Sequence, residues 1–453
     1  MASLLFRDIH TLVTMDAGNT VLHGASLLLE GGVIRQIGDA RTRAPRADRV
    51  LSGRHAVAIP GLINTHHHLY QTLTRAYGPA ADAELFDWLR TLYPIWARLD
   101  EEAVYAAALA GMAELLLSGC TTTADHHYVF PRGRGNPIDA EIRAARRIGM
   151  RFHATRGSMS VGQSKGGLPP DSVVESEERI LEDSERLIGR YHDSAPGAMV
   201  RMALAPCSPF SVSPRLMRET GRLAQRRGVR LHTHLAETRD EEAYCLAHFR
   251  KRPLDLLEDA GWLSPAAWLA HGIYFNRSEI ARLGRAGVGI AHCPTSNMRL
   301  GSGCARVPEL LRAGCPVGLG VDGSASNDSS HMLAEARQAL LLHRLRRGAA
   351  AMRVTDALRM ATVEGARCLG RDDIGSLEVG KRADIALFDL NGLGYSGAGD
   401  ALSALLLCAP ARVQTLVVEG RVVVEDGELK TLSLDRLLER HRRFAARLTA
   451  GRA

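Results

Sequence analysis

The sequence predicts an α/β fold, a TIM-like (β/α)8 barrel joined to a small β-sandwich domain built from both ends of the chain. Strand-like and helix-like segments alternate eight times between residues 59 and 371, whereas both ends carry short strands and tight turns. Alternating strands and helices are typical of parallel βαβ units, and eight of them close into a barrel. Neither end alone has enough strands for a stable sandwich. We therefore expect residues 1–58 and 372–453 to pack together beside a barrel of residues 59–371.

Each expected barrel strand is a short apolar run that precedes a helix-like stretch. In such barrels the chemistry lies at the carboxyl ends of the strands. The strands are expected at Ala58–Asn64, Thr121–Asp125, Arg151–Thr155, Val200–Ala205, Val229–Thr233, Trp268–Ala270, Val288–Ala291 and Val317–Val321. The helical stretches between them include Glu102–Ser118, Ile138–Ile148, Glu177–Tyr191, Pro214–Arg227 and Glu279–Arg285.

Both ends of the chain carry short apolar runs separated by turn residues, so we assign them to one domain. The pair Gly31-Gly32 between apolar runs is typical of a β-hairpin. Residues 433–449 form an Arg-rich amphipathic pattern that predicts a surface helix. The expected strands are Leu4–Arg7, Thr11–Met15, Ala25–Glu30, Val33–Ile37, Asp384–Asp389 and Gln414–Glu419.

Composition excludes several classes of protein. The 453 residues are 45% hydrophobic and 24% charged, as in ordinary globular proteins. The net charge of +7 comes from dispersed basic residues, nearly all of them arginine, which disfavours a nucleic-acid surface. No apolar run reaches the roughly 20 residues that cross a bilayer. The eight cysteines lack CxxC spacing and no signal peptide precedes them, so we expect free thiols in a cytoplasmic protein.

Candidate metal ligands follow the expected barrel strands. His66 and His68 stand in a His-x-His pattern at the end of the first strand, so both side chains point the same way. A lone histidine is more often a hydrogen-bonded core residue, but these recur at one strand end after another. Three imidazoles and one carboxylate suit Zn²⁺ or Fe²⁺ with a position left for water. The later strand ends carry His234, His271, His292 and Asp322.

The order of these residues resembles the amidohydrolase superfamily. Its His-x-His pair, later histidines and final aspartate are matched in sequence, as are the entry Pro60–Thr65 and the return segment Gly375–Ile385. The resemblance covers residues 3–430. Many members bridge two metals with a lysine after the fourth strand, but here Ala203–Pro209 has none and Lys165 comes too early. The resemblance therefore implies one metal, zinc or iron, held by His66, His68, His234 and Asp322.

Glu237, three residues after His234, resembles the glutamate of the family's His-x-x-Glu deaminases. A bound metal lowers the pKa of water to near 7. On this reading, Asp322 and His271 hold and deprotonate that water, and Glu237 passes a proton to a ring nitrogen. Asp322 then protonates the departing ammonia, so the chemistry favours a deaminase over an amide-ring hydrolase.

Three segments carry a narrower resemblance to 8-oxoguanine deaminases, relatives of guanine deaminase and the triazine aminohydrolases. They are His66–Ala76, Phe86–Trp96 and Thr121–Tyr128. Guanine deaminase-like proteins place an arginine where this chain has Cys207, which argues against plain guanine. We expect 8-oxoguanine to be converted to urate and ammonia, with guanine, a pterin or a hydroxylated triazine as the alternative. A non-catalytic barrel is disfavoured because no expected ligand is missing.

Several further residues are candidates for binding the purine-like ring of the substrate. The amide of Gln71 could pair with a carbonyl and an N–H edge. Arg156 could bind an oxo group or form a structural salt bridge, and Trp88 or Tyr128 could stack on the ring or pack within a loop. His126 is a candidate hydrogen-bonding partner, and Cys207 is a small buried neighbour rather than a nucleophile. By analogy with similar barrels, a homo-oligomer is expected.

Overall fold

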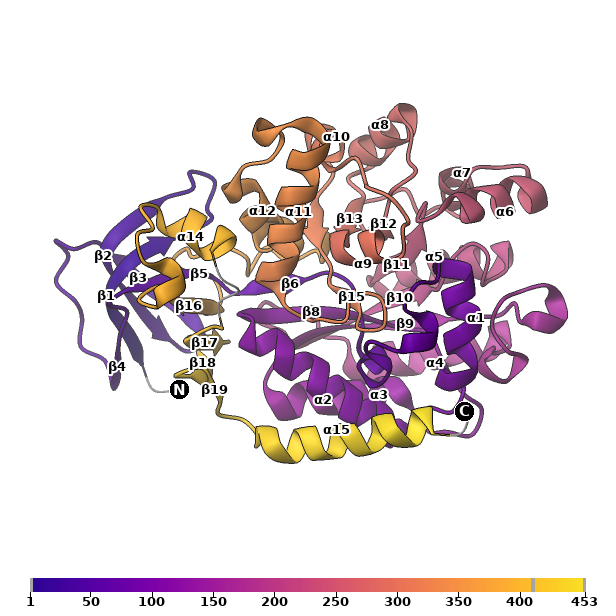
Figure 1. The fold of residues 1–453 in the computed structure, drawn as a ribbon, viewed down its shortest axis with the longest axis horizontal. Helices are drawn as coiled ribbons and strands as arrows, with labels where there is room; N and C mark the ends of the chain where they lie inside the picture. Colours follow the sequence, from indigo (N-terminus) through magenta and orange to yellow (C-terminus); the bar gives the residue numbers. More distant parts are fainter. Residues whose placement is uncertain (1–2, 409–411, 451–453) are drawn as a thin grey trace.

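The computed structural model describes residues 3–408 and 412–450, and its strands form two large systems and one two-stranded sheet (Figure 1). One large system is a closed parallel barrel, which confirms the predicted fold class. Around the barrel the order is β6-β8-β9-β10-β11-β12-β13-β14, with β14 pairing back to β6. These strands are β6 (Leu62–Asn64), β8 (Cys120–His127), β9 (Arg151–Ser158), β10 (Val200–Pro206), β11 (Arg230–Leu235), β12 (Ala267–His271), β13 (Gly289–His292) and β14 (Val317–Leu319).

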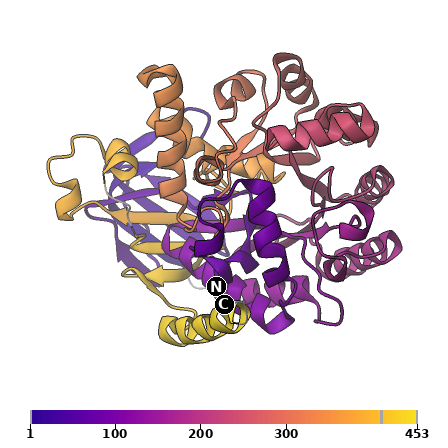
Figure 2. The same cartoon turned by 45° about the vertical axis from the view of Figure 1, so that its right-hand side comes forward.

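Helices surround the barrel (Figure 2). The described part of the chain has no helix that is both long and apolar enough to cross a bilayer. The helices are α1 (Leu85–Trp96), α2 (Glu101–Leu117), α3 (Pro137–Ile148), α4 (Glu177–Tyr191), α5 (Pro214–Arg227), α6 (Arg239–Phe249), α7 (Pro253–Asp259), α8 (Arg277–Ala286), α9 (Pro294–Arg299), α10 (Val307–Arg312), α11 (Met332–Arg347), α12 (Val354–Met360), α13 (Val363–Cys368), α14 (Ala401–Leu407) and α15 (Leu434–Thr449).

Helix α5 shows how local sequence sets these helices. Its N-cap Ser213 accepts a hydrogen bond from the Leu216 amide, and Pro214 occupies the first turn, where no amide donor is needed. Gly228 ends the helix at φ 64°, a conformation that favours glycine. Leu216 and Leu223 are buried on the face toward the barrel. The predicted bounds of α5 therefore agree with the structure.

The terminal sheet joins strands from both ends of the chain, as predicted. Its nine strands are hydrogen-bonded in the order β19-β18-β17-β16-β5-β1-β2-β3, with β4 beside β1. The boundaries 1–58, 59–371 and 372–453 remain a prediction. The strands are β1 (Leu4–Val13), β2 (Val21–Glu30), β3 (Val33–Gly38), β4 (Arg49–Ser52), β5 (Ala56–Pro60), β16 (Ile385–Asp389), β17 (Thr415–Val418), β18 (Arg421–Glu425) and β19 (Glu428–Leu429).

Three predicted strands differ in extent from those observed. Leu4–Arg7 and Thr11–Met15 belong largely to one strand, β1, which is interrupted by a register shift between Phe6 and Ile9. The expected single strand Ala58–Asn64 is instead divided: β5 pairs in the terminal sheet and β6 in the barrel. The division falls at Gly61, where an added Cβ would lie 2.3 Å from Thr121. Glycine therefore lets the chain pass directly from one sheet into the other.

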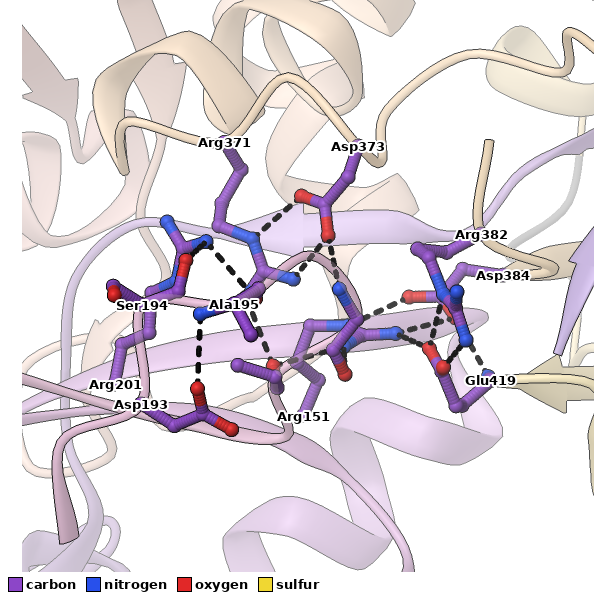
Figure 3. A network of polar contacts seen from close by, with 12 residues as sticks. Arg151, Asp193, Ser194, Ala195, Arg201, Arg371, Asp373, Arg382, Asp384 and Glu419 are labelled. Atoms are coloured by element: carbon purple, nitrogen blue, oxygen red, sulfur yellow. Dashed lines mark hydrogen bonds and ion pairs between the residues drawn. The ribbon is translucent and has the colours of Figure 1, made fainter. Parts of the chain in front are cut away.

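A buried polar network joins the amino-terminal end of the barrel to the terminal sheet (Figure 3). At its centre, Arg151 at the start of β9 is 1% exposed and makes two 3.0 Å hydrogen bonds to the Asp384 carboxylate. The same guanidinium donates to Glu419 at 2.5 Å and to the carbonyls of Gly197 and Ala198 at 2.8 and 2.9 Å. One cation thus binds two carboxylates of the sheet and the loop before β10.

Helix α15 packs along α2 and the short helix η1 (Leu69–Thr74), which follows the His-x-His pair. Phe444 and Leu448 are buried, while His441 contacts the Thr72 hydroxyl at 3.1 Å. The predicted surface helix therefore supports the segment that carries the first candidate ligands.

Replacing Arg151 by methionine should lower the free energy of unfolding by about 3–5 kcal/mol, because Asp384 would keep a buried charge without its cation. Urea unfolding followed by tryptophan fluorescence measures this change. Arg353→Met is the control, since Arg353 is 78% exposed in its pair with Asp356 and such pairs contribute about 0–1 kcal/mol. Equal unfolding midpoints for R151M and R353M would show that the network does not hold the sheet to the barrel.

Candidate active site

A pocket opens at the carboxyl ends of the barrel strands, where chemistry was expected. It encloses about 420 Å³ of space not filled by protein atoms, the part open to solvent included. Most of the residues predicted for the site contribute to its wall. The lining side chains are His68, Gln71, Leu85, Trp88, Leu89, Tyr93, Tyr128, Cys207, Ser208, Phe210, His234, Glu237, His271, Leu300, Asp322 and Ser326.

The ring orientations of His68 and His234 are set by main-chain carbonyls. His68 Nδ1 lies 2.7 Å from the His126 carbonyl oxygen, and His234 Nδ1 lies 2.7 Å from that of Cys207. A carbonyl oxygen only accepts, so each Nδ1 carries the hydrogen. Burial lowers the pKa of His68 to about 4 and that of His234 to about 3, so both rings are neutral at pH 7. Each Nε2 therefore presents a lone pair.

His66 reaches the same state through a second histidine. His232 Nδ1 lies 2.8 Å from the Trp268 carbonyl oxygen and must donate to it. Burial holds the pKa of His232 well below its usual value, so its Nε2 has no hydrogen and accepts from His66 Nδ1 at 2.8 Å. His66 Nε2 is then left with a lone pair, and it is buried without a hydrogen-bond partner. Sequence reasoning missed His232, although His232 and His234 repeat the His-x-His pattern.

The free Nε2 atoms converge with one carboxylate. His68 Nε2 lies 3.1 Å from His234 Nε2, and Asp322 Oδ1 lies 3.4 Å from His66 Nε2 and 3.3 Å from His68 Nε2. A tetrahedral ion with ligands at 2.0–2.1 Å would separate them by roughly 3.3 Å. Two lone pairs 3.1 Å apart repel each other unless a cation lies between them. The donor set therefore fits one divalent metal of the zinc type.

Glu237 and His271 stand beside this donor set. His271 Nε2 lies 3.6 Å from Glu237 Oε2 and 4.0 Å from Asp322 Oδ2, while its Nδ1 lies 2.9 Å from Asn297 Oδ1. Burial raises the pKa of Glu237 to about 7. Burial alone would lower the pKa of His271, but the Glu237 and Asp322 charges outweigh it and raise the pKa. An acid near pH 7 beside a basic imidazole is suited to proton transfer.

Glu241 fixes the segment that carries Glu237. Its carboxylate accepts the Ala236 and Glu237 amides, both at 2.9 Å. These bonds hold Ala236 at φ 54°, a left-handed conformation that non-glycine residues rarely adopt. No sequence pattern marks Glu241 as a site residue, because only the fold brings its side chain back to this turn.

Two predicted catalytic residues have left-handed backbones as well: His271 has φ 72° and Asp322 has φ 62°. Such conformations cost about 1–3 kcal/mol each and cluster at functional sites. Asp322 begins the two-residue strand β15 (Asp322–Gly323), which pairs with β7 (His67–His68). The Asp322 amide also donates to the His66 carbonyl at 3.1 Å. Direct main-chain bonds thus position the eighth strand's carboxylate against the first strand's histidines.

Four of the predicted substrate contacts line the pocket. Gln71 has both amide atoms buried without a hydrogen-bond partner in the described structure, so it faces the pocket with one acceptor and one donor free. Trp88 Nε1 donates to the Ala325 carbonyl at 3.0 Å, which fixes the indole. Tyr128 supplies an aromatic wall. Burial raises the pKa of Cys207 to about 12, so it remains a thiol and not a nucleophile.

Arg156 is not among the side chains that line the pocket, and its contact with an oxo group stays a prediction. Its side chain points to the same face of the strand as those of Phe152 and Ala154, which pack in the core between barrel and helices. Its guanidinium is bound by Glu175 and Asp183, both at 2.9 Å. The salt-bridge alternative describes this residue correctly.

His126 is likewise not part of the pocket wall. Its ring stacks against His234 with centroids 4.6 Å apart, and its Nε2 lies 2.9 Å from the Ala205 carbonyl oxygen. It supports the ligand histidines from within the barrel, as its own carbonyl does for His68. His292, at the seventh strand end, also lies away from the pocket, 3.3 Å from His343.

The rest of the wall was missed in the sequence. Tyr93, Phe210 and Leu300 come from α1, the loop after β10 and the end of α9, and no local pattern marks them as site residues.

The Amidohydrolase family model matches residues 57–423. An 8-oxoguanine deaminase from Pseudomonas aeruginosa is 54% identical over 429 residues, 94% of this chain and 95% of that protein. A hydroxydechloroatrazine ethylaminohydrolase from Pseudomonas sp. (strain ADP) is 41% identical, covering 95% and 93%. The structure of an atrazine chlorohydrolase from Arthrobacter aurescens TC1 complexed with zinc superposes with a TM-score of 0.94 at 36% identity, covering 98% and 100%.

Removal of His232 should weaken metal binding by about 10–100-fold, because His66 would lose the acceptor that fixes its tautomer. We expect this for His232→Ala, measured by competition with a chromogenic chelator. His232→Gln is the matched variant, since its amide oxygen can replace Nε2 as an acceptor and should restore part of the affinity. Wild-type affinity in H232A would contradict the assignment of the His66 tautomer.

Proposed function

The chain belongs to the amidohydrolase family, and from this premise we propose that it is a mononuclear metal-dependent aminohydrolase that converts 8-oxoguanine and water to urate and ammonia. The observation that carries the proposal is the convergence of three neutral, tautomer-fixed imidazoles and Asp322 beside Glu237 in one aromatic pocket. The 54% identity with an 8-oxoguanine deaminase over 94% of the chain supports the choice of substrate.

We propose that one divalent ion, zinc, is held by His66, His68, His234 and Asp322. When bound, such an ion lowers the pKa of a coordinated water so that it can act as a nucleophile near neutral pH. No lysine is among the side chains that line the pocket, and Lys165 lies in the surface turn η3 (Gln163–Lys165), which supports a mononuclear site.

Proton transfers are assigned to the carboxylates and His271. As the water oxygen bonds to the ring carbon that carries the amine, Glu237 protonates the adjacent ring nitrogen. Asp322 Oδ2, 4.0 Å from His271 Nε2, accepts the proton of the water, and His271 stabilises the resulting charge distribution. The C–N bond then breaks as the amine receives a proton from Asp322, and ammonia leaves. Glu237 recovers its proton when the ring nitrogen is deprotonated.

Ring recognition is assigned to Gln71 and to the aromatic wall. The unpaired amide of Gln71 can bond to a carbonyl and an N–H on one edge of an oxopurine. Trp88, Tyr128 and Phe210 offer faces and edges for a flat ring. Among the described residues, the wall contains no arginine or lysine, in keeping with a neutral substrate. Guanine, a pterin or a hydroxylated triazine remains the alternative.

We further propose a cytoplasmic location and a homo-oligomeric state. The location follows from eight cysteines that are free thiols in the structure. The oligomer rests on analogy with related barrels.

Ammonia release should be fastest with 8-oxoguanine. We expect kcat/KM for 8-oxoguanine to exceed that for guanine by at least about tenfold. A site whose polar groups bond to one pattern of donors and acceptors on the substrate ring binds a ring with a different pattern much less well. A coupled assay with guanine, isoxanthopterin and a hydroxylated triazine provides the comparison. Preference for guanine would overturn the substrate while leaving the aminohydrolase assignment in place.

Glu237→Gln should lower kcat by roughly 100-fold or more, because an amide cannot supply the proton. Metal content, measured by mass spectrometry, should stay at the wild-type level, since Glu237 is not among the four assigned ligands. Glu182→Gln, on the exposed face of α4, is the control. Wild-type turnover in E237Q would remove Glu237 from the mechanism.

A further inference from the structure

A second cavity lies at the opposite end of the barrel from the catalytic pocket, and the two share no lining residue. It encloses about 1640 Å³ of space not filled by protein atoms, the part open to solvent included as for the catalytic pocket, and is bounded by the starts of β10 and β11, helix α5 and the segment after α7. Four arginines and two histidines line it, and burial lowers the pKa of both imidazoles, so the arginines carry the charge. The arginines are Arg201, Arg218, Arg222 and Arg230, the histidines are His153 and His192, and Asp259 is the one carboxylate among the described wall residues.

Two of these arginines lie side by side without a carboxylate partner. Arg201 on β10 and Arg230 on β11 are half-buried on adjacent strands, and neither has a carboxylate within 4 Å in the described structure. Neutral carbonyls hold them instead: Arg201 donates to Gly370 and Ser194, both at 3.1 Å, and Arg230 donates to Cys368 at 2.7 Å. The Nε atoms of both are buried and unpaired. Two partly desolvated positive charges are thus left without an ion-pair partner in the described structure.

Most of the nearby carboxylates are engaged elsewhere, whereas the exposed Asp372 acts on Arg201 through its charge without forming an ion pair with it. Asp373 binds Arg371 at 2.7 Å (Figure 3), and Asp259 binds Lys251. Glu219 binds Arg222 at 2.8 Å. Asp193 accepts the Ala195 amide at 2.9 Å. None of these acids forms an ion pair with Arg201 or Arg230 in the described structure.

His153 adds a polar group that faces the same space. It is 4% exposed, lines the cavity from β9, and has an Nε2 with no hydrogen-bond partner in the described structure. Buried polar atoms are nearly always paired in native proteins, so this Nε2 is available to a polar group that enters the cavity. Arg218 lines the same cavity without an ion pair in the described structure and adds an exposed positive charge at the mouth.

We propose that this cavity is a binding site for a small oxyanion, a phosphate group that is either free or part of a phosphorylated small molecule. A phosphate carries close to two negative charges at neutral pH, which would compensate Arg201 and Arg230 together. The planar guanidinium matches phosphate oxygens through paired N–H donors, and these two retain free N–H groups. The volume leaves room for more than the phosphate group itself.

The test measures thermal stabilisation and calorimetric binding of the metal-loaded wild-type protein with inorganic phosphate and with a purine nucleoside monophosphate. Both ligands should raise the melting temperature in a concentration-dependent way. Stronger binding of the mononucleotide would identify a phosphorylated metabolite as the ligand, and equal or weaker binding would identify free phosphate. No binding of either ligand would overturn the proposal.

Arg201→Met and Arg230→Met distinguish this site from binding at the catalytic metal. Each should weaken phosphate binding at least about tenfold. In phosphate-free buffer neither should lower the melting temperature much, because no carboxylate loses its partner. Arg436→Met, on the exposed face of α15, removes the same charge and should bind like wild type. Unchanged binding in R201M and R230M would place the anion elsewhere and refute the site.

Discussion

The site depends on hydrogen bonds that fix which nitrogen of each histidine carries a proton. Main-chain carbonyls of neighbouring strands hold His68 and His234 directly, and the Trp268 carbonyl holds His66 through His232. The register of the barrel strands places these carbonyls, so the same hydrogen bonds that follow from the fold also set which nitrogen of each histidine is free. An imidazole with the opposite tautomer would point an N–H at the shared position and could not bind a cation there.

Acid–base chemistry at the pocket depends on a second constraint, the backbone of the loops. Glu237 follows a left-handed residue that the Glu241 carboxylate holds in place, and His271 and Asp322 are themselves left-handed. The rigid barrel maintains these costly conformations, which direct the three side chains toward one another. Burial then brings the pKa of Glu237 to about 7, within reach of proton exchange at neutral pH.

The sequence predicts which side chains of one strand point the same way. It does not predict which groups on neighbouring strands contact one another. The His-x-His pair and the order of later strand ends predicted which donor atoms converge in the pocket, because successive side chains of a strand point to opposite sides. Arg156 points to the same side of its strand as Phe152, away from the barrel interior. The sequence alone does not show which side of this strand faces the interior, so it could not exclude Arg156 from the site. The role of His232 required the carbonyl of Trp268 on the next strand. Phe210 and Leu300 required loop conformations that carry no local signal.

The passage at Gly61 has a consequence for how this architecture can vary. A single residue, Gly61, separates β5 of the terminal sheet from β6 of the barrel, and the proposed metal-binding pair begins five residues after it, at His66. Without a linker, recombination cannot exchange the sheet as an independent module. Any replacement must reproduce the tight approach to Thr121, or it would shift the histidines that start the catalytic rim.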